Sequence, residues 1–150
     1  MLIENPVRTP NLMNELTAVW LDSVKATHTF LSEDNIDELI PFVQTGLQTI
    51  SKLIVAYELN RAVGFIGIED DKIEMLFVQS DCIGIGVGKS LISEAIDKYN
   101  VQYVDVNEQN PNAAAFYQHF NFITFERTDF DEQGNPFPIL KMRLEYKKEV

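Results

Sequence analysis

The sequence contains little cysteine and little positive charge. Its 150 residues include one cysteine, so no disulfide can form within the chain, and a reducing cytoplasm is the expected location. Twelve lysines and arginines stand against 23 acidic residues, which gives a formal net charge of −11. A chain this acidic lacks the basic face that nucleic acids require. The charge favours a cationic partner, such as an amine or a lysine-bearing protein, although acidity can also serve solubility alone.

Long apolar runs and metal-binding patterns are also missing. No apolar stretch approaches the ~20 residues of a membrane-spanning helix, and residues 1–6 lack the basic and apolar regions of a signal peptide. We therefore expect no association with a membrane. The sequence shows no cysteine and histidine cluster, so we expect no metal cofactor. The length and the 45% hydrophobic content fit one globular domain over residues 1–150.

A glycine-rich stretch follows an apolar segment and precedes a helical pattern. Residues 73–78 are mostly apolar, and residues 83–91 read Ile-Gly-Ile-Gly-Val-Gly-Lys-Ser-Leu. Glycines at alternate positions can present a row of backbone N–H groups with no Cβ atom in the way. A helix that opens near Gly88 adds unpaired amides and the positive end of its dipole. Such an element suits a phosphate or pyrophosphate, with Lys89 at its rim.

Two common nucleotide-binding motifs do not fit this spacing. A P-loop ending in Gly88-Lys89-Ser90 would need its first glycine at position 83, which is Ile83. The dinucleotide fingerprint G-x-G-x-x-G fails because the three glycines are spaced G-x-G-x-G. A P-loop phosphotransferase is therefore disfavoured.

The glycine stretch and a second segment together resemble the GNAT (Gcn5-related) N-acetyltransferase family. Gly86 and Gly88 match the glycine positions of its motif A, [QR]-x-x-G-x-[GA], although Ile83 replaces the usual Gln or Arg. Residues 106–122 match motif B, V-x-x-x-N-x-x-A-x-x-x-Y-x-x-x-G-F, with Asn121 in place of the glycine. Asparagine tolerates the left-handed conformation that ends a helix, so this departure preserves the local geometry.

The resemblance implies an acetyl-CoA site and an acceptor site. In the family the loop amides hold the pyrophosphate of coenzyme A. The cofactor-binding residues that it implies here are Phe77, Val78, Ile83, Gly84, Ile85, Gly86, Val87, Gly88, Lys89, Ser90, Asn107, Asn110, Ala113 and Phe116. The segment after the first helix, Thr-His-x-Phe-Leu, resembles the bacterial YjaB-like branch of the family. By that likeness the acceptor site is bordered by Trp20, Ser23, Thr27, His28 and Phe30.

Tyr117 is the candidate general acid, because it occupies the motif B tyrosine that in the family lies at the coenzyme sulfur. The alternative is an ordinary half-buried aromatic residue on the helix. Asn110 would bind coenzyme A through its amide, or cap the helix that starts at Pro111, and the two roles are compatible.

The base that deprotonates the amine has two candidates, Glu74 and His28. Glu74 lies four residues before Val78 and is expected to share a strand face with Leu76 and Val78, although a solvated position at the strand end is equally consistent. His28 has an intrinsic pKa suited to neutral pH, but orienting the acceptor or making a buried polar contact would also explain it. Cys82 has no histidine beside it, which disfavours an acetyl-cysteine intermediate. His119 is given no role.

Periodicity and turn signals predict eleven elements. Helices are expected over residues 10–25, 33–50, 88–99 and 111–120, with a kink or break at Pro41. Strands are expected over residues 1–8, 52–58, 62–68, 73–78, 101–107, 122–130 and 137–146. This order matches an α/β fold of the GNAT type, with a mixed six- to seven-stranded sheet flanked by four helices. The turn over residues 131–140 is placed to overhang the acceptor site, although a plain hairpin explains its residues equally well.

These observations predict an N-acetyltransferase that moves the acetyl group of acetyl-CoA directly to a primary amine, either a protein lysine or a small molecule. A non-catalytic acyl-CoA-binding or sensing module on the same fold is the alternative, motivated by Ile83 and Asn121. A monomer and a homodimer are equally consistent with the sequence.

Overall fold

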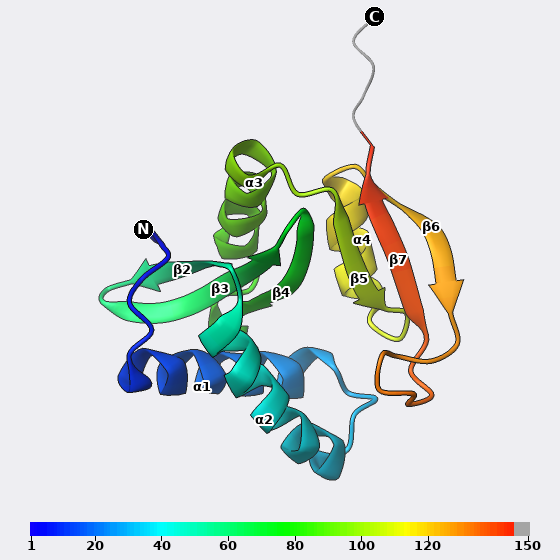
Figure 1. Ribbon diagram of the computed structural model, residues 1–150, viewed down its shortest axis with the longest axis horizontal. Coiled ribbons are helices and arrows are strands. Elements are labelled where there is room, and N and C mark those ends of the chain that lie inside the picture. The colour runs from blue at the N-terminus through cyan, green and yellow to red at the C-terminus, as the bar shows by residue number, and fades with distance from the viewer. Residues whose placement is uncertain (146–150) are drawn as a thin grey trace, which may run out of the picture.

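The computed structural model describes residues 1–145 and contains a seven-stranded mixed sheet (Figure 1). The strand order is β1-β2-β3-β4-β5-β7-β6. The strands are β1 (Leu2–Glu4), β2 (Lys52–Glu58), β3 (Arg61–Glu69), β4 (Lys72–Val78), β5 (Tyr103–Asn107), β6 (Phe122–Thr128) and β7 (Ile139–Leu144). The helices are α1 (Pro10–Thr27), α2 (Glu33–Thr49), α3 (Val87–Tyr99) and α4 (Pro111–His119), and a short 3-10 turn covers Ser80–Cys82. The expected α/β architecture is confirmed, and Tyr146, the expected end of the last strand, lies outside the described residues.

The helix starts follow from capping residues in the sequence. The Thr9 hydroxyl accepts a hydrogen bond from the Leu12 amide and Pro10 takes the first helical position of α1. Ser32 and Asn35 form a reciprocal capping box at the start of α2. The break expected at Pro41 does not occur, because α2 continues to Thr49. Pro41 and Asp37 are both exposed, so water can satisfy the carbonyl that loses its helical partner.

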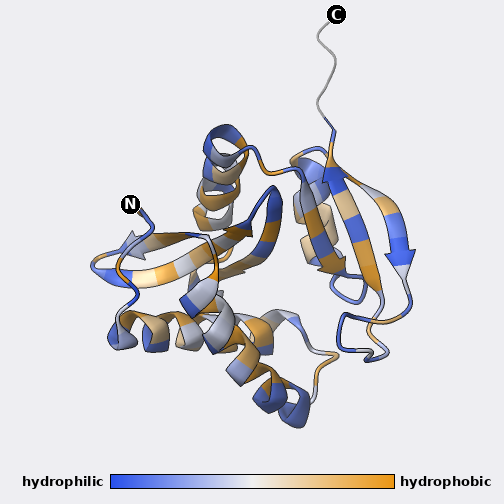
Figure 2. Cartoon of the chain, in the orientation of Figure 1, coloured by the Kyte–Doolittle hydropathy of each residue, from blue (hydrophilic) through white to orange (hydrophobic). Residues whose placement is uncertain are grey.

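Helices cover both faces of the N-terminal half of the sheet (Figure 1). Along β2, Leu53 and Val55 pack toward α1 and α2, whereas Ile54 packs toward α3. Apolar residues accordingly run along the central strands, while the first turns of α2 are hydrophilic (Figure 2). None of the helices in residues 1–145 is long and apolar enough to cross a membrane.

The sheet opens between β4 and β5. These neighbouring strands run parallel and pair only at Lys72 with Tyr103 and at Ile73 with Val104. Pairing of β4 with β3 nevertheless continues as far as Val78, and pairing of β5 with β7 continues to Asn107. The two halves of the sheet therefore separate beyond Ile73, and the gap is visible in Figure 1.

Glu74 occupies a β-bulge at this divergence. Ile73 pairs with Ile68 and Met75 pairs with Gly67, so Glu74 has no partner in the register. The extra residue reverses the alternation along β4. Ile73, Leu76 and Val78 belong to the core beneath α3, whereas Glu74 lines a cavity on the α2 side. The expectation that Glu74 shares a face with Leu76 and Val78 is therefore wrong, because the bulge shifts the period of two.

Candidate active site

A cavity of about 900 Å³ lies where β4 and β5 separate. Its walls come from β4, β5, α4, the end of α1 and the glycine loop, which is the glycine-rich segment of residues 83–88. It collects most of the residues that the family resemblance implies for the cofactor: Phe77, Val78, Ile83, Gly84, Gly86, Gly88, Lys89, Asn107, Asn110, Ala113 and Phe116. Ile85 and Ser90 are exposed outside this lining and Val87 is buried in the core, so their side chains do not reach the cavity.

The glycine loop presents free backbone amides at one end of this cavity. Gly84 and Gly86 have φ angles of +88° and +94°, and a Cβ atom on either would meet nothing within 4 Å. Glycine is therefore needed at these positions for the backbone angle, not for space. The Ser90 amide bonds to the Gly86 carbonyl, and no side chain caps α3. The first amides of α3 therefore have no partner within the helix and are available to an anion.

Helix α4 brings Tyr117 and Asn110 to the cavity wall. The Asn110 side chain, 7% exposed, accepts a hydrogen bond from the Ala113 amide at 3.2 Å and so caps the helix, as one of its two expected roles requires. Tyr117 is 7% exposed, and burial raises the pKa of its hydroxyl far above the usual value. The hydroxyl therefore stays protonated beyond the pH at which an ordinary tyrosine ionises, which is the state of a proton donor.

The end of α1 forms another part of the wall. Ser23, Thr27 and His28 line the cavity. Burial lowers the pKa of the His28 imidazole below its usual value, because the charged form loses solvation. Trp20 belongs instead to the core. Its ring packs edge to face against Phe77, with 6.5 Å between the ring centroids.

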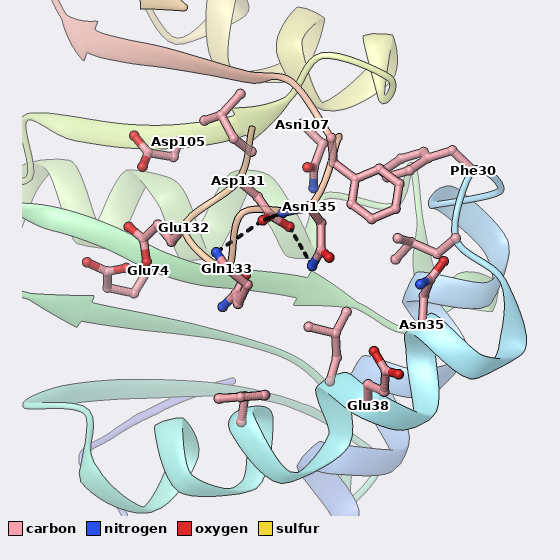
Figure 3. A pocket seen from close by; sticks show the side chains of 15 residues that line it. Phe30, Asn35, Glu38, Glu74, Asp105, Asn107, Asp131, Glu132, Gln133 and Asn135 are labelled. Atoms are coloured by element: carbon pink, nitrogen blue, oxygen red, sulfur yellow. Dashed lines mark hydrogen bonds between the residues drawn. The ribbon is translucent and has the colours of Figure 1, made fainter. Parts of the chain in front are cut away.

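A second cavity, of about 470 Å³, adjoins the first (Figure 3). Glu74, Asp105 and Asn107 line both, so the two cavities share a wall. The second cavity is lined by carboxylates from α2, β4, β5 and the turn after β6: Glu38, Glu74, Asp105, Asp131 and Glu132. Figure 3 shows Glu74 and Asp105 directed into the same space as Glu132. None of the 15 lining residues is lysine or arginine.

Aromatic side chains complete this second cavity. Phe30 and Phe137 lie 5.6 Å apart between ring centroids, and Phe42 adds to the apolar wall. The turn after β6 contributes Asp131 to Phe137, where the sequence predicts an overhang. Phe30 therefore lies at this cavity, whereas Ser23, Thr27 and His28 lie at the larger one.

The acidic groups shift the pKa of Glu74. Partial burial is the largest cause and raises it, and the carboxylates of Glu132 and Asp105 raise it further. Lys72 opposes this effect from 4.0 Å, but its ammonium is held more closely by Asp105, at 2.9 Å. The other four carboxylates of this cavity, Glu38, Asp105, Asp131 and Glu132, were not identified as site residues from the sequence. The alternation of Val104, Asp105 and Val106 is the signal that places Asp105 on the face opposite the core.

Cys82 is a buried thiol at the edge of the larger cavity. Burial raises its pKa, and the thiol donates a hydrogen bond to the Asp81 carboxylate at 3.2 Å, which raises it further. The acidic neighbour thus disfavours the thiolate that a nucleophile needs.

Replacing Cys82 by alanine should therefore leave acetyl transfer within about twofold of the wild type, at a cost of about 1 kcal/mol in stability. Steady-state assays of coenzyme A release and thermal unfolding would check both values. Loss of transfer by a folded Cys82→Ala protein, or an acetylated thiol detected by mass spectrometry, would establish covalent catalysis instead.

Comparison with known proteins gives consistent matches. A family model described as an acetyltransferase (GNAT) domain matches residues 19–146. The chain is 34% identical to peptidyl-lysine N-acetyltransferase YjaB of Escherichia coli over 128 residues, which cover 85% of this chain and 87% of that protein. Peptidyl-lysine N-acetyltransferase YiaC of Escherichia coli is 26% identical over 127 residues, which cover 82% of this chain and 87% of that protein.

Solved structures match over almost the whole chain. The solution structure of apo YjaB from Escherichia coli superimposes with a TM-score of 0.84 at 33% identity, covering 95% of this chain and 97% of that one. The PaiA N-acetyltransferase of Thermoplasma acidophilum, in complex with coenzyme A, superimposes with a TM-score of 0.71 at 20% identity, covering 97% and 99%. The second match shows a shared fold.

Proposed function

The chain belongs to the GNAT acetyltransferase family and is an acetyl-CoA-dependent N-acetyltransferase, and we propose that its acceptor is a lysine side chain of a protein or peptide. Two relatives that it matches over more than four fifths of its length are named peptidyl-lysine N-acetyltransferases. The observation that carries the proposal is the acidic second cavity, which shares a wall with the cofactor cavity.

In this proposal acetyl-CoA occupies the larger cavity. The unpaired amides of the glycine loop bind the pyrophosphate, and Lys89 adds a positive charge beside them. The pantetheine arm enters the gap between β4 and β5, along Val78 and Asn107, where the strands leave backbone groups unpaired. Asn110 and Phe116 line the same cavity from α4.

The acceptor amine reaches the thioester from the second cavity. Five carboxylates line it, and the Lys72 ammonium offsets only part of their charge, through Asp105 and Glu74. The remaining negative charge attracts an ammonium group, and the rings of Phe30 and Phe137 can contact the apolar stem of a lysine. Within residues 1–145 no three acidic, histidine or cysteine side chains are arranged to hold a metal ion. The combination of carboxylates and aromatic rings suits an organic cation.

Transfer then follows a direct sequential path. Glu74 or His28, through a water molecule, removes a proton from the ammonium group, because only the neutral amine has a lone pair. The amine attacks the thioester carbonyl, the carbon–sulfur bond breaks, and Tyr117 gives its proton to the departing thiolate. The acylated nitrogen then loses its extra proton, directly or through water, to the Tyr117 phenolate, which restores the hydroxyl. The products are the acetylated amine and coenzyme A.

Calorimetric titration with acetyl-CoA, beside ATP and NADH, tests the cofactor first, followed by mass spectrometry of acetylated lysine peptides. We expect binding of acetyl-CoA alone, and transfer to peptides that carry a lysine in a basic context. Peptides with lysine among glutamates should be poorer acceptors, because the cavity repels their carboxylates. Binding without transfer to any lysine peptide or small amine would identify a binding module instead, and transfer only to small amines would overturn the lysine assignment.

A further inference from the structure

Two hydrogen bonds at the end of α1 determine where His28 carries its proton. The Thr27 hydroxyl lies 2.7 Å from the Ser23 carbonyl oxygen and 2.8 Å from His28 Nδ1. A carbonyl oxygen only accepts, so the single hydroxyl hydrogen of Thr27 is donated to Ser23. The contact with His28 is then a hydrogen bond only if Nδ1 carries the hydrogen and donates it to Thr27.

This arrangement leaves the other ring nitrogen as an acceptor. With the hydrogen on Nδ1, neutral His28 has its lone pair on Nε2. Among residues 1–145, no hydrogen bond to Nε2 is made, and the imidazole lines the acetyl-CoA cavity. The rings of Phe30 and Phe77 flank it, with centroids at 5.5 Å and 6.4 Å. These neighbours hold the ring without competing for its lone pair.

Glu74, the other candidate base, is less suited to this step. Burial raises the pKa of Glu74, but its side chain is 40% exposed and already lies 4.0 Å from the Lys72 ammonium, so the carboxylate has a cationic partner before any acceptor binds. Glu74 also lines the acidic cavity, where its charge is better used to attract the acceptor. Burial lowers the pKa of the His28 imidazole, so the ring is uncharged near neutral pH and its lone pair is available to take a proton.

We propose that Thr27 is a positioning residue that holds His28 in the Nδ1–H tautomer, so that Nε2 takes the proton of the acceptor ammonium. The inference rests on the proposed function, because it assigns the base of that same reaction. The nitrogen–hydrogen bond of the ammonium breaks, the proton moves to Nε2 directly or through one water, and the freed lone pair attacks the thioester. The resulting imidazolium still donates from Nδ1 to Thr27 and later releases the Nε2 proton to solvent.

The test combines imidazole ¹⁵N NMR with kinetics on Thr27→Val and Thr27→Ser proteins. The chain has two histidines, so exposed His119 provides an internal reference for His28 in each spectrum. We expect the wild type and Thr27→Ser to show the Nδ1–H form of His28. Thr27→Val, which keeps the shape but removes the acceptor, should shift His28 toward the Nε2–H form and lower kcat about tenfold.

The pH dependence of kcat/KM distinguishes the two roles of His28, because a purely structural histidine would not shape it. The other titratable side chains that line the cavity are Glu74, Cys82, Lys89, Asp105, Tyr117 and His119. The acidic limb of kcat/KM should lie below pH 6.5 in the wild type, since burial lowers the pKa of His28, and it should move in His28→Gln but not in Tyr103→Phe, whose side chain lies outside both cavities.

Two results would overturn the inference: a wild-type His28 in the Nε2–H form, or a Thr27→Val protein with a changed tautomer and unchanged kcat. Failure of the proposed function is separate, since it would appear as absent amine acetylation by the wild type. In that event the spectra would still show whether Thr27 sets the tautomer, and the assignment of a base would fall with the reaction.

Discussion

Replacing Tyr117 by phenylalanine is expected to lower kcat for acetyl transfer about 100-fold, the usual contribution of one general acid. The hydroxyl is the only group removed, and the ring can keep its edge contacts with Phe116 and Phe122. The Kd for acetyl-CoA should stay within about twofold, because the lost interaction is made with the departing thiolate and not with bound thioester. Steady-state assays of coenzyme A release and calorimetric titration measure the two quantities.

The raised pKa of Tyr117 makes a further consequence testable. Burial keeps the Tyr117 hydroxyl protonated at high pH. Ionisation of Tyr117 should therefore cause no loss of activity near the usual pKa of tyrosine. Tyr103→Phe is the matched control, since Tyr103 is exposed on β5 and lies outside both cavities, and its kcat should not change. An unchanged kcat in Tyr117→Phe would remove Tyr117 as the acid and leave proton delivery to water.

Local signals were sufficient to predict most of the fold. Thr9-Pro10 and Ser32 mark the starts of α1 and α2 because their side chains satisfy amides of the first turn. Asn121 ends α4 with a φ angle of +72°, as expected of asparagine in a glycine position. The glycine loop could also be located from the sequence. Its backbone angles near +90° favour glycine, so the glycines themselves mark the positions.

The acceptor side of the site could not be predicted in the same way. A single unpaired residue in β4 decides which face Glu74 occupies, and bulges leave no clear mark in a sequence. Glu38 and Glu132 come to one cavity from α2 and from the turn after β6, so only the tertiary fold brings them together. The tautomer of His28 depends on a hydrogen bond made by its neighbour, which residue identity alone does not reveal.

Replacing Gly86 by valine is expected to raise the Kd for acetyl-CoA roughly 30-fold. A side chain at a φ angle of +94° costs about 2 kcal/mol, and a β-branched residue is among the least tolerant of that region. The loop is exposed and a Cβ atom there meets no neighbour, so it can relax to another backbone angle when the cofactor is absent. Binding must then restore the strained angle before the amides of α3 can meet the pyrophosphate.

Gly134→Val separates this effect from strain in general. Gly134 has a φ angle of +79° in the turn after β6, and a Cβ atom there also meets nothing within 4 Å. Both variants should lose stability by a similar amount in thermal unfolding, but only Gly86→Val should bind acetyl-CoA more weakly by calorimetry. Equal weakening in both would show that strain anywhere in the fold reduces binding. Unchanged binding in Gly86→Val would mean that the pyrophosphate is held elsewhere, and the glycine loop would lose its assigned role.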